Sequence, residues 1–186
     1  MLEYLQSFTG ISGVEIVVEY GYEFTSRDIE LLSAYKYNTL HLHGFEKKDE
    51  DWIQYCINTI PNFQHFVLHP DSACLEDIST SIEPWISFEN MDIRKPAYQM
   101  PQEMIDLFDR FPKSKFTFDI NHSEENNLPY DAFDTLKTPS QIHFSVVNKK
   151  YYTEYNYIDT PHALACLESD FFIDLKKYTG CIITLE

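Results

Sequence analysis

The chain has 186 residues, of which 30 are Asp or Glu and 14 are Lys or Arg, so its formal net charge is −16. A hydrophobic content of 44% is enough for a core and excludes a disordered chain, and the length predicts a single domain over residues 1–186. The acidic balance opposes the phosphate attraction used in nucleic-acid binding, which disfavours duplex DNA as a partner without excluding it.

The sequence contains no targeting or membrane segment. No apolar stretch approaches the roughly 20 residues that cross a bilayer, and the N-terminus lacks the basic and apolar regions of a signal peptide. We therefore expect a cytoplasmic protein that does not associate with a membrane. Cys56, Cys74, Cys166 and Cys181 stand far apart without a C-x-x-C pair, which predicts reduced thiols rather than a zinc ribbon or a disulfide scaffold.

Short β-rich runs alternate with helical segments along the chain. Strands are predicted at 14–20, 38–44, 64–70, 85–91, 115–121, 141–147 and 180–186. Helices are predicted near 26–36 with Ser26 as N-cap, and near 48–59, 101–111, 130–136 and 161–178, the last with an interruption. This order predicts an α/β fold with a parallel sheet and helical crossovers, and it leaves both an open doubly wound sheet and a closed barrel.

Ionisable side chains recur near the C-terminal ends of the predicted strands. They share one face, because alternate residues of a strand face opposite sides and large apolar residues occupy the other face. The set comprises His41, His43, His69, Glu89, Asp119, His143 and Glu186. In a parallel barrel, side chains at these positions converge at the mouth, where active sites form. A divalent cation offsets the repulsion between converging carboxylates, and the histidines favour Zn²⁺, Mn²⁺, Co²⁺ or Fe²⁺ over Ca²⁺ or Mg²⁺.

Four segments, SFENMD, FDINHS, HFSVVN and the terminal ITLE, resemble strands of the xylose isomerase-like TIM-barrel superfamily. The resemblance spans nearly the whole chain, and the superfamily includes sugar isomerases and epimerases and the type IV apurinic endonucleases. It implies a TIM-barrel-like (β/α) fold with seven recognisable parallel strands, incomplete because no obvious first strand precedes 14–20. It also implies a divalent metal, most commonly zinc or manganese. The implied ligands are Glu89, Asp119, His143 and Glu186, with His122 as a ligand or substrate contact.

Two further matches resemble the endonuclease branch. LHLHG places His43, and VLHPD places His69, where those enzymes have additional zinc ligands. His162 corresponds to a loop ligand of that branch. Its partner Asp159 lies one residue further away than in the Asp-x-His pair of those enzymes.

Other polar residues have simpler interpretations. A lone strand histidine is usually structural, so we expect packing or surface roles for His41 and His65. Basic residues follow two predicted strands on the catalytic side, where they can hold a substrate phosphate, although loop lysines are commonly only solvated. These residues are Arg94, Lys95, Lys149 and Lys150.

Three functions follow from the resemblance and the residues. The first is a metal-dependent isomerase or epimerase of a small sugar or sugar phosphate, with Glu89 and Glu186 as the acid/base pair and His122 beside them. The second is a zinc-dependent phosphoesterase, which His43 and His69 favour. The third is a non-catalytic metal-binding protein, or a barrel that a partner completes; a homodimer is one way to cover the strand edges that a missing first strand leaves.

Overall fold

The computed structural model describes residues 11–42, 44–129, 131–145 and 178–185. The chain divides into two compact units, Met1–Phe88 and Glu89–Glu186. The expectation of a single domain stays a prediction. Among the described residues, no helix has the length and apolar character needed to cross a membrane.

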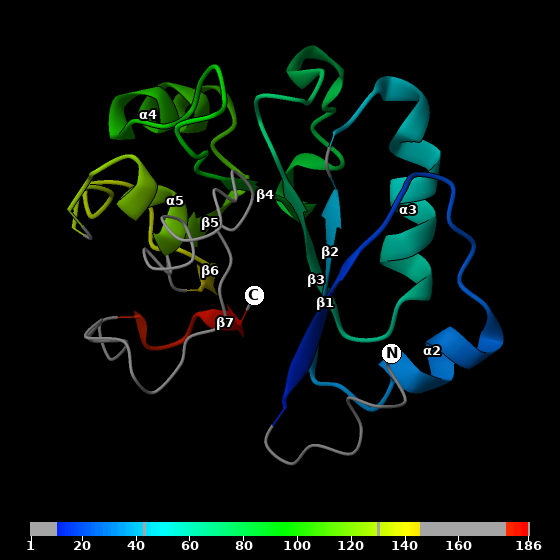
Figure 1. Cartoon of the computed structure of the whole chain (residues 1–186). Coiled ribbons are helices and arrows are strands. Elements are labelled where there is room, and N and C mark those ends of the chain that lie inside the picture. The colour runs from blue at the N-terminus through cyan, green and yellow to red at the C-terminus, as the bar shows by residue number, and fades with distance from the viewer. Residues whose placement is uncertain (1–10, 43, 130, 146–177, 186) are drawn as a thin grey trace, which may run out of the picture. The chain divides into compact units, whose positions relative to one another are not determined.

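The first unit is a parallel sheet with helical connections. Its strands lie in the order β1 (Gly13–Val17), β2 (Tyr37–Leu42), β3 (Phe63–Leu68) and β4 (Ile86–Glu89), and the last residue of β4 begins the second unit. The connections contain α2 (Ser26–Leu32), α3 (Glu50–Thr59) and three short 3₁₀ helices, η1 (Lys47–Asp49), η2 (Leu75–Asp77) and η3 (Glu83–Trp85). Figure 1 shows α2 and α3 on the same side of β1, β2 and β3.

The apolar face of the first sheet packs against these helices. α3 buries Ile53 and Cys56, and the ring centroid of its Trp52 lies 6.2 Å from that of Phe66 on β3. Because strand residues alternate, burial of Phe66 and Leu68 on this face turns the neighbouring positions of β3 to the opposite face.

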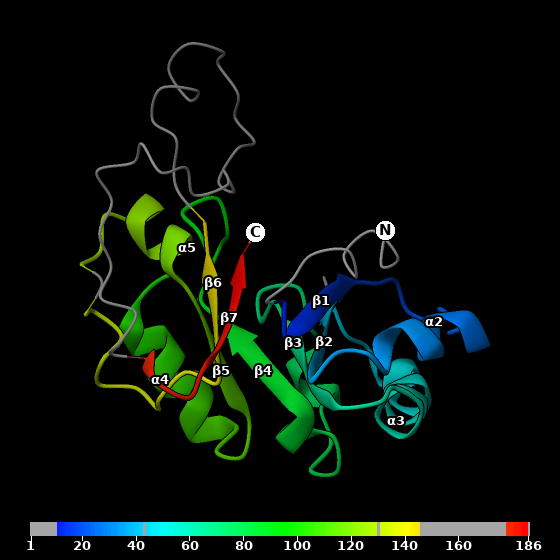
Figure 2. The ribbon, with the colours of Figure 1, turned by 90° about the horizontal axis from the view of Figure 1, so that it is seen from below.

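The second unit contains three further parallel strands. β5 (Lys115–Asp119), β6 (Gln141–Phe144) and β7 (Ile182–Leu185) pair in this order. The helices α4 (Pro101–Arg110) and α5 (Ile120–Glu125) lie on the same side of these strands in Figure 2. The strand register aligns Asp119 of β5 with His143 of β6, and His143 with Thr184 of β7.

The predicted alternation of parallel strands and helices is confirmed, and all seven predicted strands are found within a few residues of their expected bounds. Closure of the strands into a TIM barrel stays a prediction. The segment before residue 11, where a first strand was missing from the pattern, and most of the predicted helix at 161–178 lie outside the described residues.

Three local predictions were wrong. Thr25 rather than Ser26 is the N-cap of α2, because the Thr25 hydroxyl accepts the Asp28 N–H. The strand predicted at 115–121 ends at Asp119, where α5 begins. Residues 131–135 form turns instead of a helix, with hydrogen bonds from Asp134 N to Asp131 O and from Leu136 N to Phe133 O.

Candidate metal centre

Three buried residues of the second unit form a cluster with the donor atoms of a metal site. Glu89, Asp119 and His122 each offer a ligand atom, and these atoms all lie within 4.8 Å of one another. The exposed fractions of the three residues are 1%, 0% and 4%. His122 Nδ1 lies 3.6 Å from Glu89 Oε1 and 3.7 Å from Asp119 Oδ2. The structure therefore brings together three of the residues that the sequence nominated.

His143 lies beside the same carboxylates. Its Nδ1 is 3.2 Å from Glu89 Oε1 and 4.0 Å from Asp119 Oδ2. The register of β5 and β6 explains this position, because Asp119 and His143 are direct partners in the parallel pairing. The parallel pairing of these two strands thus places the side chains of Asp119 and His143 on the same face of the sheet, near the strand ends.

Asn90 fixes the backbone and the imidazole of this cluster. Its side-chain amide donates to the backbone oxygen of Asp119 at 2.9 Å and accepts from the backbone N–H of Asp119 at 2.8 Å. The backbone oxygen of Asn90 lies 2.8 Å from His122 Nδ1. A carbonyl oxygen only accepts hydrogen bonds, so this contact places a proton on His122 Nδ1.

Asp119 also determines where His122 lies, because it caps the short helix α5. Asp119 Oδ1 accepts the backbone N–H of His122 at 2.8 Å. A side-chain oxygen at the N-cap satisfies one of the backbone donors left unpaired at a helix start. The spacing of three residues between Asp119 and His122 therefore has a structural cause: it sets the imidazole three residues after the carboxylate that caps its helix.

The second ring nitrogen of His122 faces another carboxylate. His122 Nε2 lies 3.7 Å from Asp92 Oδ2. Burial lowers the pKa of His122, but the charges of Asp119 and Glu89 act in the opposite direction and raise the pKa above its usual value. In the absence of a metal ion, a positively charged His122 offsets part of the negative charge of the cluster.

Arg94 holds Asp92 through two side-chain hydrogen bonds. Arg94 Nε donates to Asp92 Oδ1 and Nη2 donates to Oδ2, each at 2.9 Å. Burial raises the pKa of Asp92, but the hydrogen bonds from Arg94 outweigh it and lower the pKa overall. Asp92 is therefore an anion that faces His122.

Gln141 contacts His143 on the side opposite Glu89, and Thr184 in turn binds Gln141. Gln141 Nε2 lies 3.1 Å from His143 Nε2 and donates to Thr184 Oγ1 at 2.7 Å. With this amide orientation, His143 Nε2 accepts and its Nδ1 donates to Glu89. Such outer hydrogen bonds orient imidazole ligands in metal sites, so we expect Gln141 to orient the imidazole of His143.

The clustered residues fit a divalent metal ion. Carboxylate oxygens and an imidazole nitrogen are ligands that zinc and manganese accept. Two carboxylates buried so close together repel each other and lose hydration, and a cation offsets both effects. The donor chemistry agrees with the sequence-based expectation of a divalent cofactor, and the identity of the metal stays a prediction.

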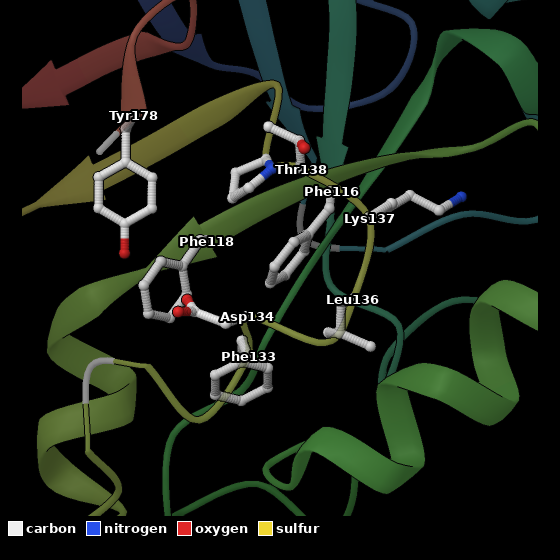
Figure 3. Close-up of a pocket in the computed structure, with 9 residues that line it drawn as sticks. Phe116, Phe118, Phe133, Asp134, Leu136, Lys137, Thr138 and Tyr178 are labelled. Carbon is white, nitrogen blue, oxygen red and sulfur yellow. The ribbon is translucent and has the colours of Figure 1, made fainter. Parts of the chain in front are cut away.

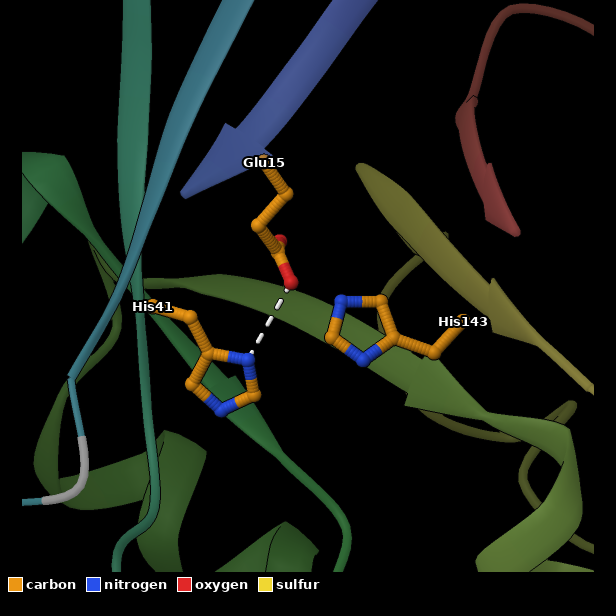
Figure 4. A group of neighbouring side chains, drawn as sticks. All are labelled: Glu15, His41 and His143. Carbon is orange, nitrogen blue, oxygen red and sulfur yellow. Dashed lines mark hydrogen bonds and ion pairs between the residues drawn. The ribbon is translucent and has the colours of Figure 1, made fainter. Parts of the chain in front are cut away.

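The first unit contains a group of two histidines and a carboxylate. His69, which follows β3, lies with its Nε2 2.9 Å from Nε2 of His41. His41 Nδ1 lies 3.1 Å from Glu15 Oε1, the contact drawn in Figure 4. His41 thus has polar partners at both ring nitrogens, which the expected packing or surface role for this residue did not include.

The remaining nominated residues divide into two groups. Arg94 and Lys95 lie in the loop after β4, where Arg94 binds Asp92 and the Lys95 backbone N–H donates to the Asp92 carbonyl oxygen. The others lie outside the described residues: His43, Lys149, Lys150, His162 and Glu186.

Sequence reasoning missed five residues that surround these groups. They are Glu15, His41, Asn90, Asp92 and Gln141. The sequence did contain a signal for two of them, because Asn90 and Asp92 follow Glu89 within three residues at a strand end. The partners of Glu15 and Gln141 depend on strand register, which spacing within a single strand does not reveal.

A cavity of about 200 Å³ in the second unit lies on the opposite face of β5 from Asp119. Phe116 and Phe118 line it together with Phe133 and Tyr178, as Figure 3 shows. These β5 residues alternate with Thr117 and Asp119, so the cavity faces away from the clustered carboxylates. Asp134, Lys137 and Thr138 add polar groups to this aromatic lining, and the cavity contains none of the clustered metal-binding groups.

Comparison with known proteins gives no relative for this chain. No family model, no curated protein and no solved structure matches it. The resemblance to the xylose isomerase-like superfamily therefore stays a prediction, which depends on the quoted motifs alone.

Proposed function

We propose that this chain is a divalent-metal-dependent enzyme whose metal is held by Glu89, Asp119 and His122. The observation that carries the proposal is the convergence of these three buried groups within 4.8 Å in the second unit. A purely structural role for them would place two carboxylates in a buried site, at a cost in hydration and repulsion that a cation relieves. His143 is the next candidate ligand through Nδ1, once its proton leaves.

Within this class, we propose an isomerase or epimerase of a sugar or sugar phosphate. When bound, the metal supplies electrostatic stabilisation of adjacent substrate oxygens and thereby acidifies the neighbouring C–H group. Glu89 accepts the proton from carbon. Before the metal binds, His143 holds the Glu89 carboxylate by its hydrogen bond to Oε1. In the family resemblance, Glu186 is the second member of the acid/base pair.

Two basic residues, Arg94 and Lys95, follow β4 and support a phosphorylated substrate. Arg94 already uses two N–H groups on Asp92, so the pair serves first to hold Asp92 toward His122. Lys95, the next residue along, adds a second positive charge to the same loop and is the better candidate for a phosphate contact.

A zinc-dependent phosphoesterase is the second candidate function. The histidine pair of the first unit favours it, because hydrolytic sites often use more than one metal ion and the pair offers further nitrogen ligands. The net charge of −16 weighs against a duplex DNA substrate, whereas a small phosphoester escapes this objection.

The test combines a variant with an isotope measurement. Glu89→Gln keeps the shape of the side chain but removes its charge and its capacity to accept a proton, so we expect turnover to fall at least about a hundredfold. If Glu89 is both ligand and base, saturating metal restores binding and leaves the rate low. Incorporation of solvent deuterium at a substrate carbon supports the isomerase. Phosphoester cleavage without such exchange supports the hydrolase. If the original chain has neither activity at full metal occupancy, the result supports a non-catalytic metal-binding protein.

A further inference from the structure

The carboxylate of Asp92 lies beside the metal cluster and is held by a single residue of the loop after β4. Asp92 Oδ1 accepts the backbone N–H of Arg94 at 2.7 Å and its Nε–H at 2.9 Å, and Asp92 Oδ2 accepts from Nη2 at 2.9 Å. The side chain of Asp92 is 2% exposed. Because three hydrogen bonds fix both oxygens, Oδ2 faces His122 in a defined orientation.

The Nδ1 atom of His122 lies close to the position of a metal ligand. It is 3.6 Å from Glu89 Oε1 and 3.7 Å from Asp119 Oδ2. Two ligand atoms of one tetrahedral zinc ion are about 3.4 Å apart, because each lies about 2.1 Å from the metal. An ion between these carboxylates therefore meets Nδ1 with little movement of the ring.

Metal binding through Nδ1 moves the role of hydrogen-bond donor to the other side of the ring. A ligating nitrogen carries no proton, so Nδ1 gives up the proton that faces the Asn90 carbonyl oxygen. The proton of the neutral imidazole then lies on Nε2. Nε2 lies 3.7 Å from Asp92 Oδ2, and an approach of less than about 1 Å turns this ion-pair contact into a hydrogen bond.

We propose that Asp92 is a positioning residue, which Arg94 holds so that it selects the form of His122 with a proton on Nε2 and a lone pair on Nδ1. Metal-binding histidines commonly donate their second N–H to a carboxylate, which fixes the ring and strengthens the ligand. The inference rests on the proposed function, because it concerns the metal held by His122 and its two carboxylate neighbours. All of these residues belong to the second unit.

The experiment locates the ring proton of His122 in the full chain. Protein with ¹⁵N-labelled histidines is saturated with Zn²⁺, and the two nitrogen shifts of His122, identified by their absence in His122→Gln, show which nitrogen is protonated. We expect the proton on Nε2 and the metal on Nδ1. A proton on Nδ1 in the zinc-loaded chain would overturn the proposal. This measurement uses the original chain, so a folding defect in a variant leaves it decisive.

Two substitutions separate positioning from simple electrostatics. Asp92→Asn keeps the shape but cannot accept from Arg94 and His122 through two oxygens, so Zn²⁺ binding should weaken about 10-fold to 100-fold. Arg94→Gln removes a positive charge, which by electrostatics alone tightens cation binding, whereas loss of the hydrogen bonds to Asp92 should weaken it about 10-fold. Unchanged or tighter binding in Arg94→Gln would overturn the proposal. Ile93→Ala is the matched control, because Ile93 is 59% exposed in the same loop.

Asp119→Asn distinguishes a failure of this proposal from a failure of the proposed function. If Asp119→Asn loses the ion and Asp92→Asn binds it as tightly as the original chain, Asp92 has no positioning role and the metal centre stands. If Asp119→Asn binds Zn²⁺ as tightly as the original chain, the metal centre is wrong and the role of Asp92 falls with it. Thermal unfolding of each metal-free variant checks that it is folded.

Discussion

The Nδ1 atom of His122 lies 2.8 Å from the backbone carbonyl oxygen of Asn90, and this contact determines which ring nitrogen can meet a ligand. Nδ1 carries the proton, so Nε2 is the atom that holds a lone pair in neutral His122. Nε2 faces Asp92, whereas Nδ1 faces Glu89 and Asp119. Metal binding through Nδ1 therefore requires loss of the hydrogen bond to Asn90.

The protonation of His122 should make the stability of the metal-free protein pH-dependent. The pKa of His122 is raised in the folded state, above the usual value of about 6.5. Its contribution to stability is therefore fully present below about pH 6.5 and is lost as the pH rises through the raised pKa. Urea unfolding of the original chain and of His122→Gln measures this, and the difference in unfolding free energy should shrink between pH 6 and 9. A difference that grows over this range contradicts a charged His122.

Asp119→Asn should separate the stability of the metal-free protein from its response to metal. The substitution removes one of two neighbouring buried carboxylate charges and keeps an oxygen that can cap α5, so we expect the free energy of unfolding to change by less than about 1 kcal/mol. Metal at about 100 times its Kd should stabilise the original chain by about 2.7 kcal/mol and should fail to stabilise the variant.

Asp109→Asn is the matched control for this substitution. Asp109 is exposed on α4, outside the cluster. Thermal unfolding with and without Mn²⁺ or Zn²⁺ should show the full metal response in Asp109→Asn. An equal response in both variants excludes Asp119 as a ligand.

Strand positions were readable from the sequence because apolar residues alternate there with polar ones. Phe118 and Ile142 mark the packed face of β5 and β6, and Asp119 and His143 fall on the opposite face by simple alternation. The end of β5 was missed, because Ile120 continues the apolar pattern although Asp119 already caps α5. Local hydrogen bonding at a strand end is invisible to a pattern of period two.

The site was only partly readable for the same reason. The ligand candidates Glu89, Asp119 and His122 carry motifs in their own segments. The grouping of Glu15 with His41 depends instead on the pairing of β1 with β2. The sequence around Glu15 contains no motif that would predict a functional site there. The histidine pair was hidden too, because a single histidine in a strand commonly packs without a function.

The N-cap of α2 allows a test of the local fold with two adjacent residues. Thr25→Ala removes the hydroxyl that accepts the Asp28 N–H and should lower the free energy of unfolding by about 1 kcal/mol. Ser26→Ala is the matched control and should have little effect, because Ser26 is already inside the helix. Denaturant unfolding of the two variants measures the difference, and a larger loss in Ser26→Ala would contradict the assigned cap.

Thiol modification should distinguish the described cysteines. Burial raises the pKa of the Cys56 thiol to about 12, whereas Cys74 is exposed. Because Cys74 is exposed and the Cys56 thiol is buried, Cys74 should react rapidly with a disulfide reagent and Cys56 only after unfolding. Mass spectrometry of digested, modified protein locates the labels. Equal labelling of both residues in the native protein contradicts the burial of Cys56 on α3.

The metal content of Glu89→Gln, compared with that of the original chain, tests the proposed centre most directly. Equilibrium dialysis against Zn²⁺ or Mn²⁺, followed by elemental analysis, measures bound ions per chain. We predict that the original chain retains an ion that Glu89→Gln loses, because the amide removes an anionic ligand from the cluster with Asp119 and His122. The same number of ions at the same affinity in both proteins would contradict a metal centre at Glu89.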